Sequence, residues 1–324
     1  MRAGGSADPL FDVLSITLPI FAVMLVGYLV VRFGPLTRAT MKALGDFTML
    51  VTLPCALFVA VASRDFAEVV NLNYLITLAL AGVATQAVMW GVLRVQGTGP
   101  KRRALAVLAS ATPNTAFIGF PIFLLVIPEH AGPVVAMNLL IENILLTPIG
   151  LIILGRAGAE GEQVSQLRLL GRILLSVIRR PLIIGLGLGF AVVLTGLRVP
   201  GEVMRFADLL GQAAAPIALV VIGGSLFGLN LRGDLGLASQ ITAVKLLVHP
   251  ALVVATLTVL TMLGITTLGT ELTMGLILTA TLPMFAIFVL FGQEAGHEGL
   301  ASLSVMIATV LSFVTVNLAL MLLL

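Results

Sequence analysis

The chain has 324 residues, of which 59% are hydrophobic and only 10% are charged. Soluble domains carry about 25% charged residues, so this composition, with a mean hydropathy of +1.15, excludes a soluble globular protein. The net charge of +3 and the pI of about 9.5 are explained by basic loops at one membrane surface, and they do not require binding to nucleic acid.

Apolar stretches long enough to cross a bilayer recur along the whole chain. A membrane-spanning helix needs about 20 mostly apolar residues, and ten stretches meet this requirement. We therefore predict an all-α membrane protein with ten spans, numbered 1 to 10 in chain order. They are Leu10 to Arg32, Lys42 to Ser63, Leu72 to Leu93, Ala104 to Ile127, Pro133 to Leu154, Ile173 to Leu197, Arg205 to Leu229, Ala238 to Leu263, Leu272 to Gly292 and Leu300 to Leu324.

The distribution of basic residues predicts how these spans are oriented. The N-terminus has only Arg2 before two aspartates, unlike the basic start of a secretory signal, so the first stretch is retained as a span. Most arginines and lysines fall in the loops after spans 1, 3, 5 and 7. Basic loops stay in the cytoplasm, so both termini are predicted to lie outside.

Residues half a chain length apart match one another, which indicates an internal duplication. The predicted repeats are 1–162 and 163–324, and each holds five spans. Because five is odd, the second repeat must insert upside down relative to the first, as in many secondary transporters. The matching pairs include Pro19 with Pro181, Asp46 with Asp208, Pro54 with Pro216, and Pro121 with Pro283.

Span 4 contains the stretch SATPNTAFIGFPIFLLVIP, which breaks the rules for a continuous helix. Pro113 and Pro121 bracket Gly119 at the expected mid-depth of the membrane, and proline removes a backbone donor and clashes with the preceding turn. Freed backbone groups are tolerated in a bilayer only where protein or a watery cavity receives them. Asn114 either lines a site there or satisfies the freed backbone. We favour the site. Span 9 carries Thr281 and Pro283 in a second predicted break.

Ionisable and polar residues within spans 5 and 8 are the other functional candidates. Glu142 lies about halfway along span 5, followed by Asn143 and Thr147, and a charged residue there costs about 2.5–3.5 kcal/mol on insertion scales. It is either a functional carboxyl facing the break or a neutral group that fixes helix packing. Lys245 and His249 share one face of span 8. Lys245 either pairs with Glu142 or extends to the interface.

The glycines of span 6 permit close helix approach. Gly185, Gly187 and Gly189 alternate along it, which indicates a packing or dimer face. They do not form a nucleotide-binding fingerprint, because no strand precedes them and the spacing differs. No cofactor, metal site or enzyme activity is predicted.

Several of these stretches together resemble the auxin efflux carrier family, whose bacterial members include carriers of malonate and other organic acids. They are NTAFIGFP at 114–121, ENILLTP at 142–148, IGGSL at 222–226, KLLVHP at 245–250 and TLPMF at 281–285. The resemblance implies a fold like that of the bile acid sodium symporters, with broken spans 4 and 9 crossing. It also implies a scaffold of spans 1, 2, 6 and 7, a moving unit of spans 3–5 and 8–10, a homodimer and a location in the bacterial inner membrane.

The leading hypothesis is secondary transport of a small organic anion, malonate-like or auxin-like, by an elevator-type motion. Asn114, Thr115, Gly119, Pro121, Thr281 and Pro283 would bind the anion, while Glu142, Asn143, Lys245 and His249 would couple transport to a proton or pair charges. One alternative is a sodium-coupled symporter, with sodium held by backbone carbonyls, Glu142, Asn143 and Thr147. Another is a membrane sensor or scaffold that binds a ligand without moving it.

Overall fold

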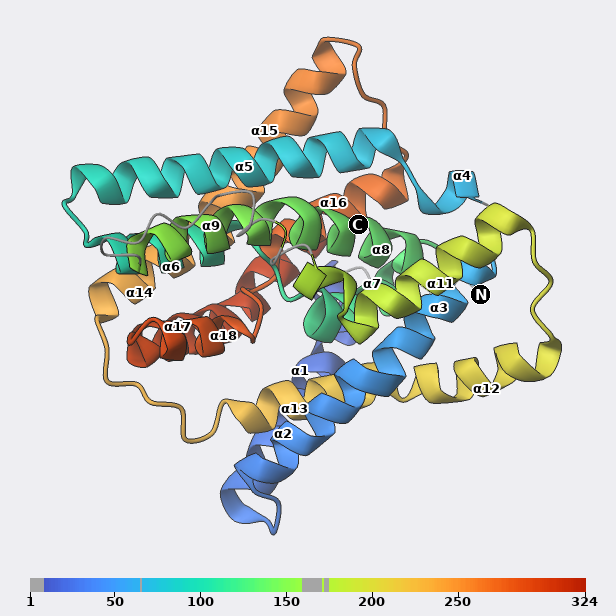
Figure 1. Ribbon diagram of the computed structural model, residues 1–324, viewed down its shortest axis with the longest axis horizontal. Helices are drawn as coiled ribbons and strands as arrows, with labels where there is room; N and C mark the ends of the chain where they lie inside the picture. The colour runs from blue at the N-terminus through green and yellow to red at the C-terminus, as the bar shows by residue number, and fades with distance from the viewer. Residues whose placement is uncertain (1–8, 65, 159–170, 172–174) are drawn as a thin grey trace.

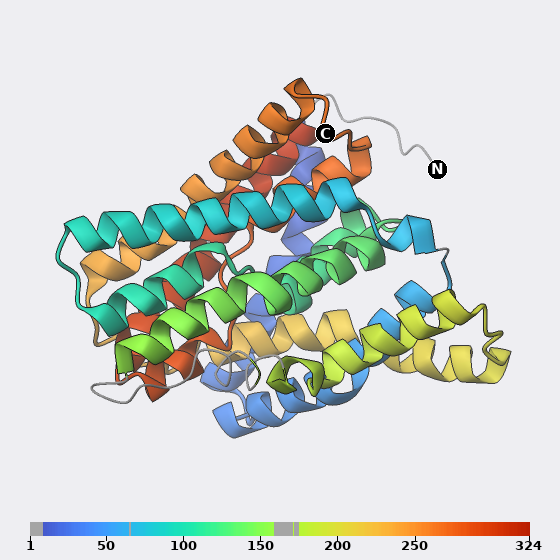
Figure 2. The same cartoon turned by 45° about the horizontal axis from the view of Figure 1, so that its top comes forward.

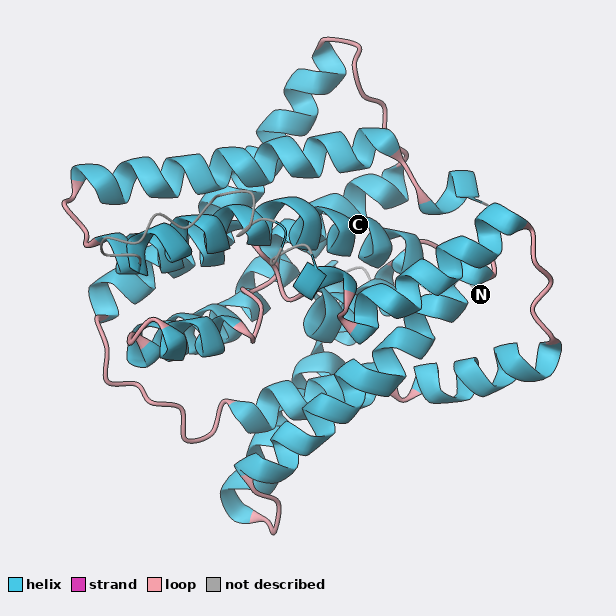
Figure 3. Ribbon diagram, in the orientation of Figure 1, coloured by secondary structure: helices cyan, strands magenta, loops and turns pink. Residues whose placement is uncertain are grey.

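A computed structural model describes residues 9–64, 66–158, 171 and 175–324. This part of the chain is helical, and its only ladder-type pairing is an isolated bridge between two loop segments (Figure 3). The helices of the first half are α1 (Pro9–Phe33), α2 (Arg38–Phe47), α3 (Leu53–Ala62), α4 (Phe66–Val69), α5 (Leu72–Val95), α6 (Pro100–Ala111), α7 (Phe120–Val126), α8 (Ala131–Ile141) and α9 (Thr147–Gly158).

The helices of the second half are labelled, with those of the first, in Figure 1. They are α11 (Pro181–Thr195), α12 (Gly201–Gln212), α13 (Ala214–Ser225), α14 (Leu235–Ala243), α15 (His249–Met262), α16 (Thr270–Thr281), α17 (Phe288–Glu294) and α18 (Glu298–Leu323). Four wider, π-helical turns each run directly into the next helix, and all but the second also continue the preceding helix without a break. They are η1 (Thr48–Thr52), η2 (Thr115–Gly119), η3 (Glu142–Leu146) and η4 (Val244–Val248).

Among the described residues, seven helices are long and apolar enough to cross a membrane, and they correspond to predicted spans 1, 2, 3, 5, 7, 8 and 10. The other three predicted spans have shorter helical pieces. In span 4, α6 ends at Ala111 and helix resumes at Thr115; in span 9, α16 ends at Thr281 and α17 starts at Phe288. Part of predicted span 6, residues 173 and 174, lies outside the described residues; residues 175–178 are helical, and α11 covers Pro181–Thr195.

Each π-helical turn ends two residues before a proline. Pro54, Pro121, Pro148 and Pro250 are all the second residue of the helix that follows the turn, and the residue before each donates its N–H to the carbonyl five positions back. The proline ring would clash with a carbonyl at the usual position four residues earlier. Widening the turn by one residue removes that clash and keeps the helix continuous.

Helix packing separates two groups that meet near the middle of the molecule (Figures 1 and 2). In one group α1 packs along α13, and α3 packs between α11 and α12; in the other, α5 packs on α6 and α15, while α18 packs on α14, α16 and α17. Close backbone approach fixes the first group, because a side-chain carbon on Gly223 would lie 1.7 Å from the Met24 carbonyl oxygen.

Two of the three alternating glycines of α11 contact another helix, and the third does not. Gly185 and Gly189 lie against α3, where an added carbon would meet Pro54 and Val61. These two glycines therefore serve packing within the chain. Gly187 has open space around it, so the predicted close-contact face involves two of the three glycines.

Candidate functional site

The two helix breaks lie against each other. They comprise residues 112–114 and 282–287, and they run antiparallel with Pro113 paired to Met284. The Asn114 N–H donates to the Pro283 carbonyl at 2.8 Å, and the Phe285 N–H donates to the Thr112 carbonyl at 3.2 Å. Each break therefore satisfies backbone groups that the other leaves without a helical partner, which a lipid environment would not do.

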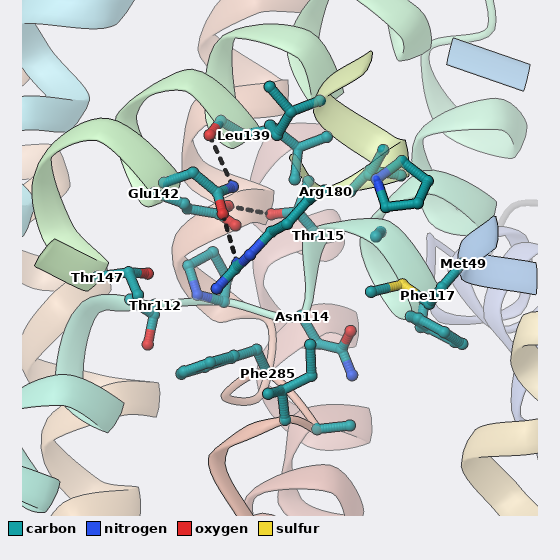
Figure 4. Close-up of a pocket in the computed structure, with 18 residues that line it drawn as sticks. Met49, Thr112, Asn114, Thr115, Phe117, Leu139, Glu142, Thr147, Arg180 and Phe285 are labelled. Atoms are coloured by element: carbon teal, nitrogen blue, oxygen red, sulfur yellow. Dashed lines mark hydrogen bonds between the residues drawn. The ribbon is translucent and has the colours of Figure 1, made fainter. Parts of the chain in front are cut away.

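A cavity of about 250 Å³ lies beside this crossing (Figure 4). Residues from both breaks line it, together with residues from η2, from η3 and from the start of α11. Its apolar side includes Met49, Phe117 and Phe285, and polar groups are few. The polar lining residues are Thr112, Asn114, Thr115, Glu142, Asn143, Thr147 and Arg180.

The Glu142 carboxyl is held at the edge of this cavity by the neighbouring η2 turn. The Thr115 hydroxyl donates a hydrogen bond to Glu142 Oε1, and only 7% of Glu142 is exposed. Glu142 is the first residue of η3, and the wide turn at this point is the one that precedes Pro148. Two proline-dependent turns from predicted spans 4 and 5 thus bring the acid and its hydroxyl partner together.

Asn143 and Arg180 form the second polar contact of the cavity. Arg180 Nη1 donates to Asn143 Oδ1 at 2.8 Å, and Asn143 Nδ2 donates to the Leu139 carbonyl at 2.9 Å. Figure 4 shows the Arg180 side chain lying inside the cavity, close to Glu142 and Thr115. Arg180 is half-buried and immediately precedes α11, so a cation from the second half of the chain reaches a site otherwise built around the crossing.

The Asn114 side chain has a different environment. It is 5% exposed, and within the described residues its amide has no hydrogen-bond partner. Figure 4 shows this amide directed away from the Glu142 and Arg180 pairs. A buried amide normally finds partners for its donors and acceptor, so an unoccupied hydrogen-bonding group faces the cavity.

Behind the crossing lies a buried polar cluster that does not line the cavity. Asn138 Nδ2 donates to Thr279 Oγ1 at 2.7 Å, and the Tyr74 hydroxyl donates to Asn138 Oδ1 at 2.8 Å. Lys245 Nζ donates to the Ala280 carbonyl at 2.8 Å, at the end of α16. These contacts fix α16 where it stops, and they therefore position the second break.

The structure brings four of the ten predicted site residues together in the cavity: Asn114, Thr115, Glu142 and Asn143. The other predicted anion-binding residues do not line it. Gly119 packs beside Leu282 and Phe123, Pro121 is buried in α7, and the Thr281 hydroxyl donates to the Leu278 carbonyl. Pro283 contributes only its carbonyl, as the acceptor for Asn114.

Lys245 and His249 do not line the cavity either. Lys245 is completely buried and bonded to backbone, so it does not extend to the interface, and no ion pair joins it to a described carboxylate. His249 Nδ1 is 2.9 Å from the Thr85 hydroxyl.

Arg180 is the main site residue that the sequence reasoning missed. It follows Arg179 and precedes Pro181, so the excess of basic residues in cytoplasmic loops explained it fully. The available signal was the Arg-Pro pair, because proline at the first helical position fixes the residue before it at the helix start. The described residues contain no group of three His, Cys, Asp or Glu placed to hold a metal ion.

Comparisons with known proteins cover the segments that form this cavity. Residues 12–320 match the family described as "Membrane transport protein". A protein of Rhizobium meliloti (strain 1021) named "Putative malonate transporter" is 25% identical over 316 residues, which cover 94% of each chain. A protein of Escherichia coli (strain K12) named "Uncharacterized transporter YfdV" is 26% identical over 239 residues, which cover 72% of this chain and 74% of the relative.

Proposed function

The chain belongs to the membrane transport protein family, the family of the auxin efflux carriers, and we propose that it moves a small organic anion across the membrane as a secondary transporter. The cavity at the crossed breaks is its binding site. The observation that carries this proposal is the unpartnered Asn114 amide, held at the break and facing that cavity. Irregular backbone at membrane depth persists where it lines a cavity, and such cavities hold the substrates of transporters.

The size and lining of the cavity support a short substrate. Pockets for drug-sized ligands are about 300–1,000 Å³, and this one, at about 250 Å³, suits a smaller molecule. Asn114 can donate to a carboxylate. Malonate, named for the relative in Rhizobium meliloti, is therefore the first compound to test on this chain.

The proposed motion is an elevator-type movement of one helix group past the other. The scaffold would be spans 1, 2, 6 and 7, and the moving unit spans 3–5 and 8–10, from two inverted repeats of five spans. The closest packing within the proposed scaffold, of α1 on α13 and of α3 on α11 and α12, supports this division. We place the protein in the bacterial inner membrane as a homodimer with both termini outside.

Proteoliposome flux tests the proposed function. Purified protein should take up or release labelled malonate, and Asn114→Ala should lower kcat/KM roughly 10-fold, because it removes a hydrogen bond to a charged ligand worth about 1.5–3 kcal/mol. Asn73→Ala is the matched control, since Asn73 does not line the cavity and its side chain bonds the Thr267 carbonyl. Binding without flux across a panel of organic acids would instead favour a sensor.

The coupling ion is read from the same assay. Replacing sodium at a constant proton gradient distinguishes the two forms of transport, because a sodium-coupled symporter loses flux and a proton-coupled carrier does not. When the proton gradient is changed at constant sodium, the flux of a proton-coupled carrier changes and that of a sodium-coupled symporter does not.

A further inference from the structure

The two charged residues that line the cavity, Glu142 and Arg180, are each bonded to a neutral side chain and not to each other. Glu142 is bonded to the Thr115 hydroxyl, whereas the guanidinium of Arg180 is bonded to the neutral amide of Asn143. Arg180 is the one cation among the lining residues that the structure describes. No ion pair joins it to a carboxylate of the described residues.

Backbone hydrogen bonds fix the main chain of Arg180 at the start of α11, and a separate contact holds its side chain. Its carbonyl accepts hydrogen bonds from the Ile183 and Ile184 N–H groups at 2.9 and 3.0 Å, and Pro181 begins the helix. The side chain then leaves the helix start and enters the cavity, where Asn143 holds it. Asn143 is itself fixed by the Leu139 carbonyl, so the guanidinium is held in place ahead of any ligand.

A guanidinium that is half-buried and bonded only to a neutral amide gains from meeting an anion. Arginine has five N–H donors in a planar fork, and a carboxylate accepts two of them in parallel. Hydrogen bonds between charged partners are roughly twice as strong as those between neutral groups. The Asn143 amide is therefore a weaker partner for Arg180 than a ligand carboxylate would be.

We propose that Arg180 is the residue that selects anions in this cavity, by exchanging the Asn143 amide for the carboxylate of the bound ligand. This rests on the proposed function for the identity of the ligand as an organic acid. Asn143 keeps the guanidinium aimed into the empty cavity. Glu142, the other charged lining residue, accepts its hydrogen bond from Thr115 and makes no ion pair with Arg180, so the guanidinium keeps donors for the ligand carboxylate.

The exchange also connects ligand binding to the two helix groups. Arg180 begins α11, which packs on α3, whereas Asn143 lies in η3, between α8 and α9. The hydrogen bond between them joins these two parts of the molecule across the cavity. When the ligand takes over the guanidinium, that direct link is released.

Binding of malonate and of its uncharged diamide, malonamide, to the purified full-length protein tests the assignment. Arg180→Gln should weaken malonate binding about 10-fold or more, equivalent to the loss of one charge-assisted contact, and leave malonamide binding unchanged. Arg180→Lys should restore part of the malonate affinity. Arg179→Gln is the matched control, because Arg179 is exposed and does not line the cavity.

Asn143→Asp provides a second variant that does not remove the arginine. It places a permanent carboxylate beside Arg180, so it should raise the thermal midpoint and weaken malonate binding at the same time. A merely structural Arg180–Asn143 contact would give the higher midpoint with unchanged malonate affinity, and that result would overturn the proposal.

The remaining outcomes separate this inference from the proposed function. If Arg180→Gln binds malonate as tightly as the wild type, or loses affinity for malonate and malonamide equally, the role of Arg180 is refuted. The proposed transport function is not affected by either result. Arg180-dependent malonate binding without any flux would refute transport and keep the anion site. A wild-type protein that binds no acid of the panel would refute both.

Discussion

Glu142 illustrates how a single charged residue is accommodated at membrane depth. Its transfer into a bilayer is costly, but it is almost completely buried and its carboxyl accepts a hydrogen bond from Thr115. A carboxyl with one hydroxyl partner, facing a cavity, can gain and lose a proton as the cavity changes its access to water. We therefore interpret Glu142 as the proton-carrying group of the proposed transport cycle.

Glu142→Gln should abolish the dependence of malonate flux on pH while leaving the protein folded, because glutamine keeps the hydrogen bond from Thr115 and cannot titrate. The measurement is flux in proteoliposomes at several pH values with the internal pH held constant. Glu129→Gln is the control, since Glu129 is exposed and pairs with Arg64. A pH profile of Glu142→Gln that matches the wild type would contradict the proton-carrying role.

At the scale of the element, proline determines two different structures in this chain. At Pro113 and Pro283 the helix stops, and the freed backbone pairs across the crossing. At Pro54, Pro121, Pro148 and Pro250 the helix continues through a π-helical turn. Pro19 lies inside α1 with neither outcome, so proline alone does not specify which structure forms; the packing around it decides.

Pro148→Ala should reduce malonate flux strongly and leave the thermal midpoint unchanged or higher. Without the proline ring, η3 can return to the normal helical turn, which rotates Glu142 and Asn143 relative to the cavity. Pro19→Ala is the control, because no π-helical turn accompanies Pro19. Flux of Pro148→Ala equal to that of the wild type would show that η3 is not needed to orient these side chains.

Gly223→Ala tests the close contact of α13 with α1. The added carbon would overlap the Met24 carbonyl, and overpacking a fitted contact costs about 1–3 kcal/mol, so the thermal midpoint in detergent should fall. Gly187→Ala, where the surroundings are open, should leave the midpoint unchanged or raise it, because alanine favours helix over glycine. Equal midpoints for the two variants would contradict the packing described for α13.

At the scale of the whole molecule, the proposed orientation in the membrane rests on the basic loops and is open to direct measurement. Asn230 and Thr267 are exposed on either side of the candidate span Leu235–Met262. The natural chain has one cysteine, Cys55, so Cys55→Ala gives a background for single-cysteine labelling.

In intact cells, Thr267→Cys should react with a membrane-impermeant maleimide, and Asn230→Cys should react only after the membrane is opened. The physical reason is that basic loops, such as the one that carries Arg232, are expected to stay in the cytoplasm. The reverse pattern would overturn the orientation with both termini outside. Labelling of both positions in intact cells would mean that the segment between them does not cross the membrane.

The sequence by itself determined the features that depend on local chemistry. Hydropathy placed the helices that now form the candidate spans, because about 20 apolar residues in a row have no other stable surroundings than lipid or a protein core. Pro113 and Pro283 placed the two breaks, because the lost N–H is a property of the residue itself. Asn114, Thr115, Glu142 and Asn143, which line the cavity, were predicted as site residues because polar groups at membrane depth are costly and therefore usually functional.

Only the tertiary structure decided what lies opposite those residues. Arg180 is far from Asn143 in sequence, and its charge was explained equally well by membrane topology, so nothing local pointed into the cavity. Lys245 was predicted either to pair with Glu142 or to extend to the interface, but it is buried and its hydrogen bond goes to the Ala280 carbonyl at the end of α16. Hydrogen-bond partners across helices depend on packing, and packing is set by all the elements together, which is why the composition of the cavity, unlike the positions of the breaks, required the folded chain.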